Sequence, residues 1–129
     1  LHHGLANALM LEPVMRFNLD IAHAKFAELA HVVGAGGAED FVPWLMRLKR
    51  EIGIAPSLSA VGVQRTQIPA LVDIAEKDIC HQTNPRPCTR DDFKRFFEQA
   101  AAGRTDLLGN RPQGAGTGGG VLPVRWIEQ

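Results

Sequence analysis

The stretch EDFVPWLMRLKREI, from Glu39 to Ile52, decides the class of fold. Acidic residues open this stretch and basic residues close it, an order that suits the dipole of an α-helix. Gly53 follows as a stop signal. The large apolar side chains recur every three or four positions, which is the spacing of one helix face: Phe41, Trp44, Leu45, Leu48 and Ile52. The pattern therefore predicts an amphipathic helix.

Comparable patterns predict four more helices. Pro13 lacks an amide hydrogen and is expected to kink the first helix or end it early. Asp20 is the predicted N-cap of the second helix. Thr89 is the predicted N-cap of the last, with Asp92 in the position of a capping box. The four predicted helices span residues 4–18, 22–33, 66–79 and 90–102.

The connecting segments agree with this assignment. Residues 54–63 are predicted to be a connector with a short helical turn that ends at Gly62. Residues 80–88 contain two prolines and are expected to be non-helical, with Ile79 as the last inward-facing residue of the helix before them. No run has the alternation and composition of a strand. The predicted fold class is all-α, a bundle of about five helices.

The character of the chain changes at residue 103. The remainder is rich in glycine and offers few side chains that could form a core. Such a composition cannot offset the entropy lost on ordering by burying apolar surface. We therefore expect a helical domain over residues 1–102 and a disordered Gly-rich tail over residues 103–129.

Composition limits the class of protein. Lys plus Arg and Asp plus Glu number 14 each, so no electrostatic attraction to nucleic acid or to an anionic membrane is expected. Apolar runs are far shorter than the roughly 18 residues of a membrane span, and no targeting segment is recognisable at the start. Two cysteines close together in one loop are typical of a protein from a reducing compartment. A cytoplasmic protein is the resulting expectation.

Three motifs carry more specific information. They are His3-Gly4-Leu5-Ala6-Asn7-Ala8, Val14-Met15-Arg16-Phe17-Asn18 and Cys80-His81-Gln82-Thr83-Asn84-Pro85-Arg86-Pro87. Over residues 1–102 the chain resembles the C-terminal part of the iron-containing (group III) alcohol dehydrogenases. This resemblance implies a helical domain and hydride transfer between an alcohol or aldehyde and NAD or NADP.

The resemblance also implies a metal ligand. Enzymes of that family hold one Fe(II), sometimes Zn(II), through an aspartate and three histidines, the last of which immediately precedes a glycine. The matching residue is His3. His2 stands where the family usually has proline and is not assigned a ligand role. The nucleotide-binding domain and the other ligands have no counterpart in the chain, so we expect it to bind metal weakly and to be inactive alone.

The Cys80–Cys88 loop allows several interpretations. The resemblance places this loop near the active-site cavity, which makes Cys80 a predicted substrate-pocket residue. A structural zinc site of Cys80, His81 and Cys88 is disfavoured, because zinc needs four ligands and these three have awkward spacing. A cysteine nucleophile is disfavoured further, since no base is indicated. Asn84-Pro85-Arg86-Pro87 is predicted to be a rigid turn, in which Arg86 can bond carbonyls at helix ends.

Two hypotheses of function remain. In the first, the chain is the C-terminal part of a metal-dependent, NAD(P)-linked alcohol dehydrogenase. In the second, it is a non-catalytic helical module for binding or oligomerisation. Either way, helices separated from their packing partners should expose apolar faces and tend to associate, for instance as a homo-oligomer. Histidines, an aspartate and a glycine-rich strand-turn-helix encoded upstream of Leu1 would favour the first hypothesis.

Overall fold

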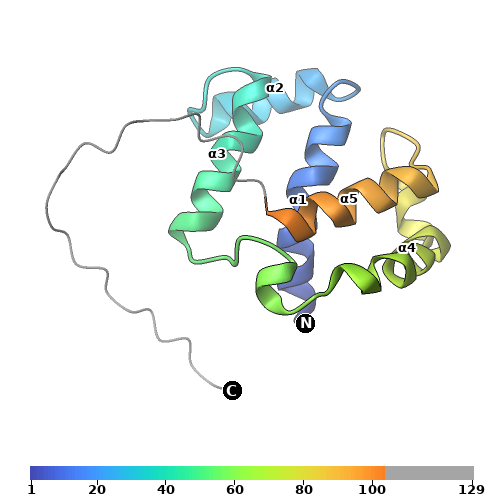
Figure 1. Cartoon of the computed structure of the whole chain (residues 1–129). Coiled ribbons are helices and arrows are strands. Elements are labelled where there is room, and N and C mark those ends of the chain that lie inside the picture. Colours follow the sequence, from blue (N-terminus) through green and yellow to red (C-terminus); the bar gives the residue numbers. More distant parts are fainter. Residues whose placement is uncertain (104–129) are drawn as a thin grey trace, which may run out of the picture.

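The computed structural model describes residues 1–103, and within them it contains five α-helices and no strand (Figure 1). The predicted all-α class is confirmed. Short 3₁₀ turns occupy Ser59–Val61, Arg65–Gln67 and Ile79–Thr83. The α-helices are α1 (His3–Asn18), α2 (His23–Val32), α3 (Ala38–Glu51), α4 (Ile68–Lys77) and α5 (Arg90–Ala102).

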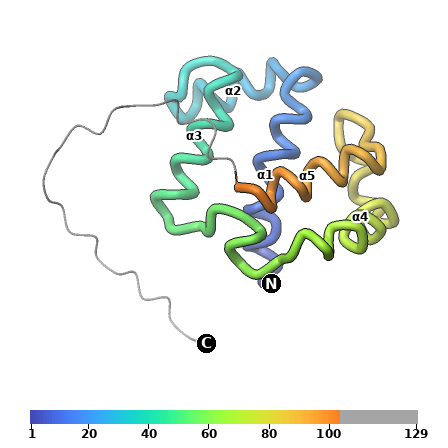
Figure 2. Tube along the Cα trace, in the orientation of Figure 1, coloured from blue at the N-terminus to red at the C-terminus, as the bar shows by residue number. Residues whose placement is uncertain are grey.

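Helix α1 lies at the centre of the molecule. The α2–α3 pair packs on one side of it and the α4–α5 pair on the other, with α5 crossing α1 (Figures 1 and 2). The segment between α3 and α4 runs beneath the end of α5, where the amide of Leu58 donates to the carbonyl of Ala100 over 2.8 Å. The last helix of the described residues, α5, thus contacts both α1 and the segment between α3 and α4.

Two separate apolar clusters hold these helices together. The larger one joins α1, α4, α5 and the 54–63 segment, and its buried members are Leu9, Leu58, Ile68, Val72, Phe93, Phe96, Ala100 and Ala101. The smaller one lies between α2 and α3, with Phe26, Ala30, Ala38, Phe41 and Val42 buried. Met15 of α1 packs against the smaller cluster, so α1 takes part in both.

The first two helices differ from the prediction at their boundary. Pro13 is buried inside α1, and the helix continues beyond it to Asn18 instead of ending early. Asp20 does not cap α2, whose N-cap is Ala22 without a side-chain hydrogen bond. The backbone keeps turning after α1, since the amide of Ala22 donates to the carbonyl of Asn18. Asp20 therefore lies within that turn.

The end of α4 also differs from the prediction. The helix stops at Lys77, and Asp78 adopts an extended backbone. The Asp78 carboxylate accepts a hydrogen bond from the amide of Cys80 and so starts the 3₁₀ turn Ile79–Thr83. Ile79 is consequently 74% exposed, not inward-facing. The expectation of a fully non-helical 80–88 loop was wrong for the first half of that loop.

The remaining boundaries are confirmed within one or two residues. Helix α3 begins at Ala38, and the amide of Gly37 donates to the Asp40 carboxylate over 2.8 Å. Segment 54–63 contains its short helical turn, which Gly62 ends with a φ of +89°. Thr89 caps α5, with Asp92 completing the capping box.

Two further expectations concern the Gly-rich tail and the absence of a membrane-spanning helix. The predicted disorder of the Gly-rich tail, residues 103–129, falls almost entirely on residues 104–129, which lie outside the described part. The division into a domain of residues 1–102 and a tail thus stays an expectation. Within residues 1–103, no helix is both long and apolar enough to cross a lipid bilayer.

Candidate functional site

An apolar groove opens between α1, α5 and the loop of residues 79–88. Its volume is about 430 Å³. We call it the α1–α5 groove. Met10 and Val14 of α1 form one wall and Ala75 of α4 contributes from below. The other lining residues come from the loop and from α5: Cys80, His81, Thr83, Asn84, Pro85, Cys88, Phe93, Phe96 and Phe97. A surface of this kind suits the apolar part of a small molecule.

Cys80 lies exposed on the loop wall of this groove. A hydrogen bond from its thiol to the Asp78 carboxylate, together with the negative charge of that group, raises the pKa of Cys80. A raised pKa keeps the sulfur protonated at neutral pH, and a protonated thiol is a poor nucleophile. The geometry therefore gives Cys80 the character of a polar wall residue.

His81 stands beside Cys80 on the same wall. Its imidazole meets the ring of Phe93 edge to face, with the ring centroids 5.3 Å apart. Its Nε2 atom lies 3.3 Å from the carbonyl oxygen of Glu76, the last turn of α4. His81 thus ties the groove wall to α4 and packs against the aromatic lining.

His3 is the first residue of α1 and is exposed to solvent. Its Nε2 atom lies 3.2 Å from the side-chain nitrogen of Asn7. Residues spaced three or four apart share a helix face, so His3 and Asn7 follow the same stripe as Met10 and Val14 in the groove. His3 lies about 10 Å along the axis from Met10, at 1.5 Å per residue. The predicted ligand and the groove therefore face the same side of α1.

The predicted site residues do not form a complete metal centre by themselves. Within residues 1–103, no three side chains of His, Cys, Asp or Glu lie close enough together to hold a metal ion. A neutral imidazole is a good ligand for Fe(II) or Zn(II), and the exposed His3 ring fits that use as one member of a larger set. Its partners would have to come from outside the described residues.

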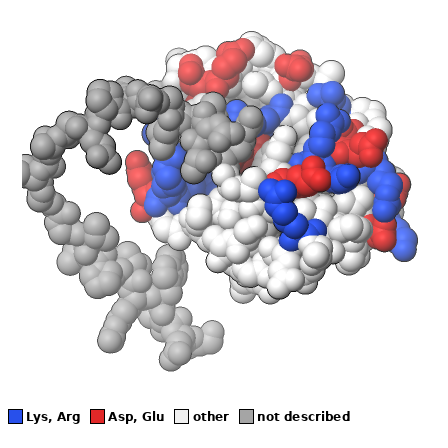
Figure 3. Space-filling model, viewed as in Figure 1, with Lys and Arg blue, Asp and Glu red and all other residues white. Residues whose placement is uncertain are grey.

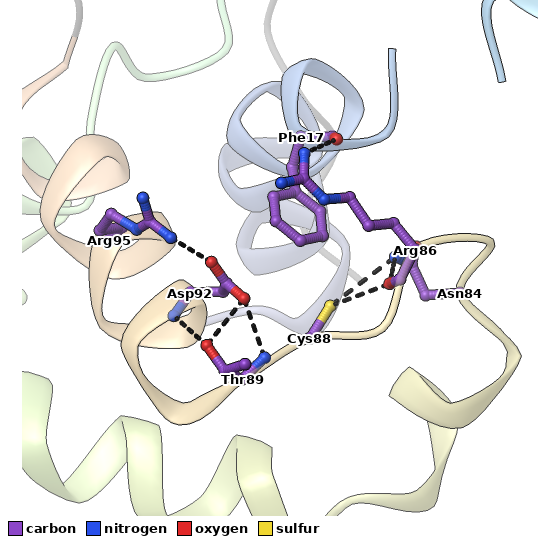
Figure 4. A network of polar contacts seen from close by, with 7 residues as sticks. All are labelled: Phe17, Asn84, Arg86, Cys88, Thr89, Asp92 and Arg95. Carbon is purple, nitrogen blue, oxygen red and sulfur yellow. Dashed lines mark hydrogen bonds and ion pairs between the residues drawn. The ribbon is translucent and has the colours of Figure 1, made fainter. Parts of the chain in front are cut away.

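The loop is fastened to the end of α1 by two side chains, Asn84 and Arg86, and Figure 4 shows the Arg86 contact. Asn84 and Asn18 exchange a pair of hydrogen bonds of 2.7 and 2.8 Å between their amide groups. Arg86 donates from Nη1 to the carbonyl oxygen of Phe17 over 3.0 Å. The predicted bonding of Arg86 to a helix-end carbonyl is confirmed.

A second polar cluster follows at the start of α5 (Figure 4). The Asp92 carboxylate accepts from the amide of Thr89 over 2.9 Å and from its hydroxyl over 2.8 Å, and it also pairs with Arg95. The hydrogen bond from the Thr89 amide is the main cause of a lowered pKa for Asp92. This cluster fixes the direction of α5, and with it Phe93 and Phe96 in the groove.

Sequence reasoning missed the Asn18–Asn84 pair. The two residues are 66 positions apart, and no local pattern connects them. Each was part of a recognised motif, Val14–Asn18 and Cys80–Pro87. The presence of one asparagine in each of these two motifs was the only signal available. The structure brings these two motifs together and leaves His3 at the far end of α1.

The fold and the site define a helical domain. It has a groove beside its central helix and a histidine on the same side of that helix. Residues 1–101 match the family described as "Fe-containing alcohol dehydrogenase family, C-terminal". This match covers more than half of the chain. The chain therefore belongs to the iron-containing alcohol dehydrogenase family.

Individual relatives agree with this membership. The chain is 36% identical over 106 residues to lactaldehyde reductase of Escherichia coli (strain K12), covering 76% of this chain and 28% of that protein. It is 33% identical over 106 residues to 1,3-propanediol dehydrogenase of Klebsiella pneumoniae, with 76% and 27% covered. It is 31% identical over 108 residues to NAD-dependent methanol dehydrogenase of Bacillus methanolicus, covering 78% of this chain and 28% of that protein.

A solved structure confirms the fold. The crystal structure of 1,3-propanediol oxidoreductase superimposes with a TM-score of 0.74 at 33% identity, covering 78% of this chain and 28% of that one. The chain thus spans between a quarter and a third of the length of these relatives.

Proposed function

We propose that the chain is the C-terminal helical part of a metal-dependent, NAD(P)-linked alcohol dehydrogenase. The observation that carries this proposal is the family match over residues 1–101, which begins at the segment of His3 and Gly4. The reaction would transfer hydride between a small alcohol or aldehyde and a nicotinamide cofactor. The cofactor and most of the active site would be held by a region outside the described residues.

Each site residue has a proposed role. His3 would donate its imidazole as one ligand of Fe(II) or, alternatively, Zn(II). When bound, such an ion supplies Lewis-acid polarisation of the alcohol or carbonyl oxygen. Cys80 would line the substrate pocket, where its protonated thiol contacts the substrate without attacking it. The apolar lining of the α1–α5 groove would exclude water from that side.

The cellular setting belongs to the same proposal. Both cysteines of the chain are free thiols, which suits a reducing compartment. We therefore propose a cytoplasmic enzyme acting on a small-molecule alcohol or aldehyde.

The experiment compares three proteins: this chain, a version extended upstream in its own reading frame, and the extended version with His3→Ala. Bound iron and zinc are measured by elemental analysis. Reduction of NAD and NADP is followed with propane-1,3-diol and methanol, and oxidation of NADH and NADPH with lactaldehyde. The extended protein should bind close to one metal ion and be active, whereas the chain alone should show neither property.

The His3→Ala variant should lose most of the metal and the activity, because one of few ligands is removed. His31→Ala is the matched control, since His31 is an exposed histidine on α2, and it should leave both properties unchanged. Full metal content in His3→Ala would refute the ligand assignment. An extended protein without activity toward any of these substrates would refute the proposed reaction.

One observation favours the alternative of an association module. Several large apolar side chains are exposed within residues 1–103, including Val32 at 81%, Ile79 at 74% and Ile74 at 66%. Figure 3 also shows a broad area without Lys, Arg, Asp or Glu on one face of the molecule. Exposed large apolar side chains are typical of faces that pack against another chain or domain.

A further inference from the structure

The loop wall of the α1–α5 groove is tied to the C-terminal end of α1 by polar contacts. Between Asp78 and Thr89 the loop lines the groove with Cys80, Thr83 and Asn84, among others. Its hydrogen bonds to α1 come from the Asn84 and Arg86 side chains, which reach Asn18 and Phe17 at the C-terminal end of that helix, and Figure 4 shows the bond of Arg86. We call these contacts the loop latch.

Asn84 uses nearly all the hydrogen-bonding capacity of its amide. Its oxygen accepts from the Asn18 nitrogen, while its nitrogen donates to the Asn18 oxygen over 2.8 Å and to the carbonyl oxygen of Arg86 over 2.6 Å. A primary amide has two N–H donors and one oxygen acceptor. A carboxylate at this position has the same shape but no donor, and it would face two acceptor oxygens.

Arg86 completes the latch from the other side of the turn. Its guanidinium donates to the carbonyl oxygen of Phe17, one of the carbonyls that a helix end leaves without an intrahelical partner. The guanidinium carbon also lies 4.0 Å above the centre of the Phe17 ring. Phe17 in turn meets Phe96 of α5 edge to face, with the centroids 5.0 Å apart. The latch therefore connects the loop, α1 and α5.

The prolines make this anchoring effective. Pro85 and Pro87 flank Arg86 and fix the backbone on both sides of it. Fixing Asn84 and Arg86 thus leaves little freedom for the rest of the turn. Any movement of the latch would displace Cys80 and Thr83 relative to Met10 and Val14 across the groove.

We infer that Asn84 and Arg86 are positioning residues, which hold the Cys80 wall at a fixed distance from α1 and so set the width of the groove. The inference depends on the proposed function only where it treats the groove as the substrate side. The latch itself is a property of the described residues and can be measured without catalysis.

The first test measures opening of the latch in this chain. Cys88 is half-buried, and its sulfur lies 3.7 Å from the Asn84 amide nitrogen. In a Cys80→Ser background, the rate at which a maleimide labels Cys88 reports opening of the loop. Asn84→Asp should raise that labelling rate roughly fivefold or more, because loss of the Asn18–Asn84 hydrogen bonds exposes the Cys88 thiol. Gln82→Glu is the matched control, an identical amide-to-carboxylate change at an exposed position of the same loop.

The direction of this change is diagnostic. A new carboxylate near Cys88 raises the pKa of its thiol and therefore slows labelling, so faster labelling can only come from greater exposure. Equal rates in Asn84→Asp and Gln82→Glu would overturn the latch. Should Asn84→Asp unfold the chain by circular dichroism, Asn18→Ala breaks the same pair from α1, and its labelling rate decides.

The second test uses the upstream-extended enzyme of the proposed function. Asn84→Asp and Arg86→Gln should raise KM for the alcohol more than they lower kcat, with the metal content unchanged. Arg86→Lys keeps the charge and should recover part of the loss. Faster labelling with an unaltered KM would overturn the positioning role. If the unsubstituted extended enzyme is inactive, the proposed function fails, and the labelling rates alone decide whether the latch exists.

Discussion

At the residue scale, Asp92 is the one charged residue that is buried within residues 1–103. It accepts two hydrogen bonds from Thr89 and pairs with Arg95, although the residue is 6% exposed. The Thr89 amide lowers its pKa from the ordinary value of 3.8. A group with a lowered folded-state pKa stabilises the fold above its unfolded pKa, and that contribution disappears as the pH falls through the folded value.

The corresponding prediction concerns acid stability. Asp92→Asn should lower the free energy of unfolding at pH 7 by about 1 kcal/mol, because the neutral amide loses the ion pair with Arg95 and accepts weaker hydrogen bonds from Thr89. It should also make the loss of stability below pH 3.8 shallower, since the titrating group is gone. Urea unfolding at several pH values measures both effects. Asp20→Asn, the same change in an exposed turn, serves as control, and equal behaviour of the two variants would contradict the role of Asp92.

At the element scale, the helices and most of their ends could be predicted, whereas the junctions at Asp20 and Asp78 could not. Periodic apolar residues identify α3 and α5 within a local window, and the capping box of Thr89 is a local signal as well. Asp78 is different, because an Asp side chain can either stay in a helix or bond a nearby amide and end it. The choice made here depends on the packing of the 79–88 loop, which the sequence around residue 78 does not reveal.

The candidate site follows the same division. Cys80 and His3 could be singled out from motifs, because each belongs to a short contiguous segment. The Asn18–Asn84 pair could not, since it depends on how α1 and the loop meet in space. The groove itself forms where α1 meets the loop and α5, which follow it by more than 60 residues, so its apolar lining became visible only in the folded chain.

A prediction at this scale concerns the turn that begins at Asp78. Its carboxylate accepts from the Cys80 amide and is the main cause of the raised pKa of the Cys80 thiol. Asp78→Asn should therefore lower the pKa of Cys80 toward its ordinary value and increase the thiolate fraction at pH 8. The rate of Cys80 alkylation, measured in a Cys88→Ser background, should rise. Asp73→Asn on α4 is the control, and an identical rate in both variants would contradict the assignment.

At the scale of the whole molecule, exposed apolar side chains determine how copies of the chain behave in solution. Ile74 and Ile79 are both more than half exposed and lie five positions apart, at the end of α4 and the start of the turn that follows it. Val32 is 81% exposed at the end of α2, in the other half of the molecule. Association through these side chains would be driven by the removal of their apolar surface from water.

We expect the chain alone to self-associate in a concentration-dependent manner through the face of Ile74 and Ile79. Replacing both by Ser should shift the sedimentation coefficient toward that of a monomer. Val32→Ser tests a distant face and should have the smaller effect. A chain that is monomeric at all concentrations would refute the prediction, and a larger effect of Val32→Ser would assign the association to α2.

The two separate apolar clusters also have a consequence for folding. The α2–α3 hairpin has its own buried side chains and touches the rest of the described chain mainly through α1. Such a hairpin can open while α1, α4 and α5 remain packed, so amide protons in the two regions exchange with solvent through different openings. A single free energy of unfolding then no longer describes every part of the molecule. The packing therefore predicts two cooperative units that share one helix, which hydrogen exchange would resolve.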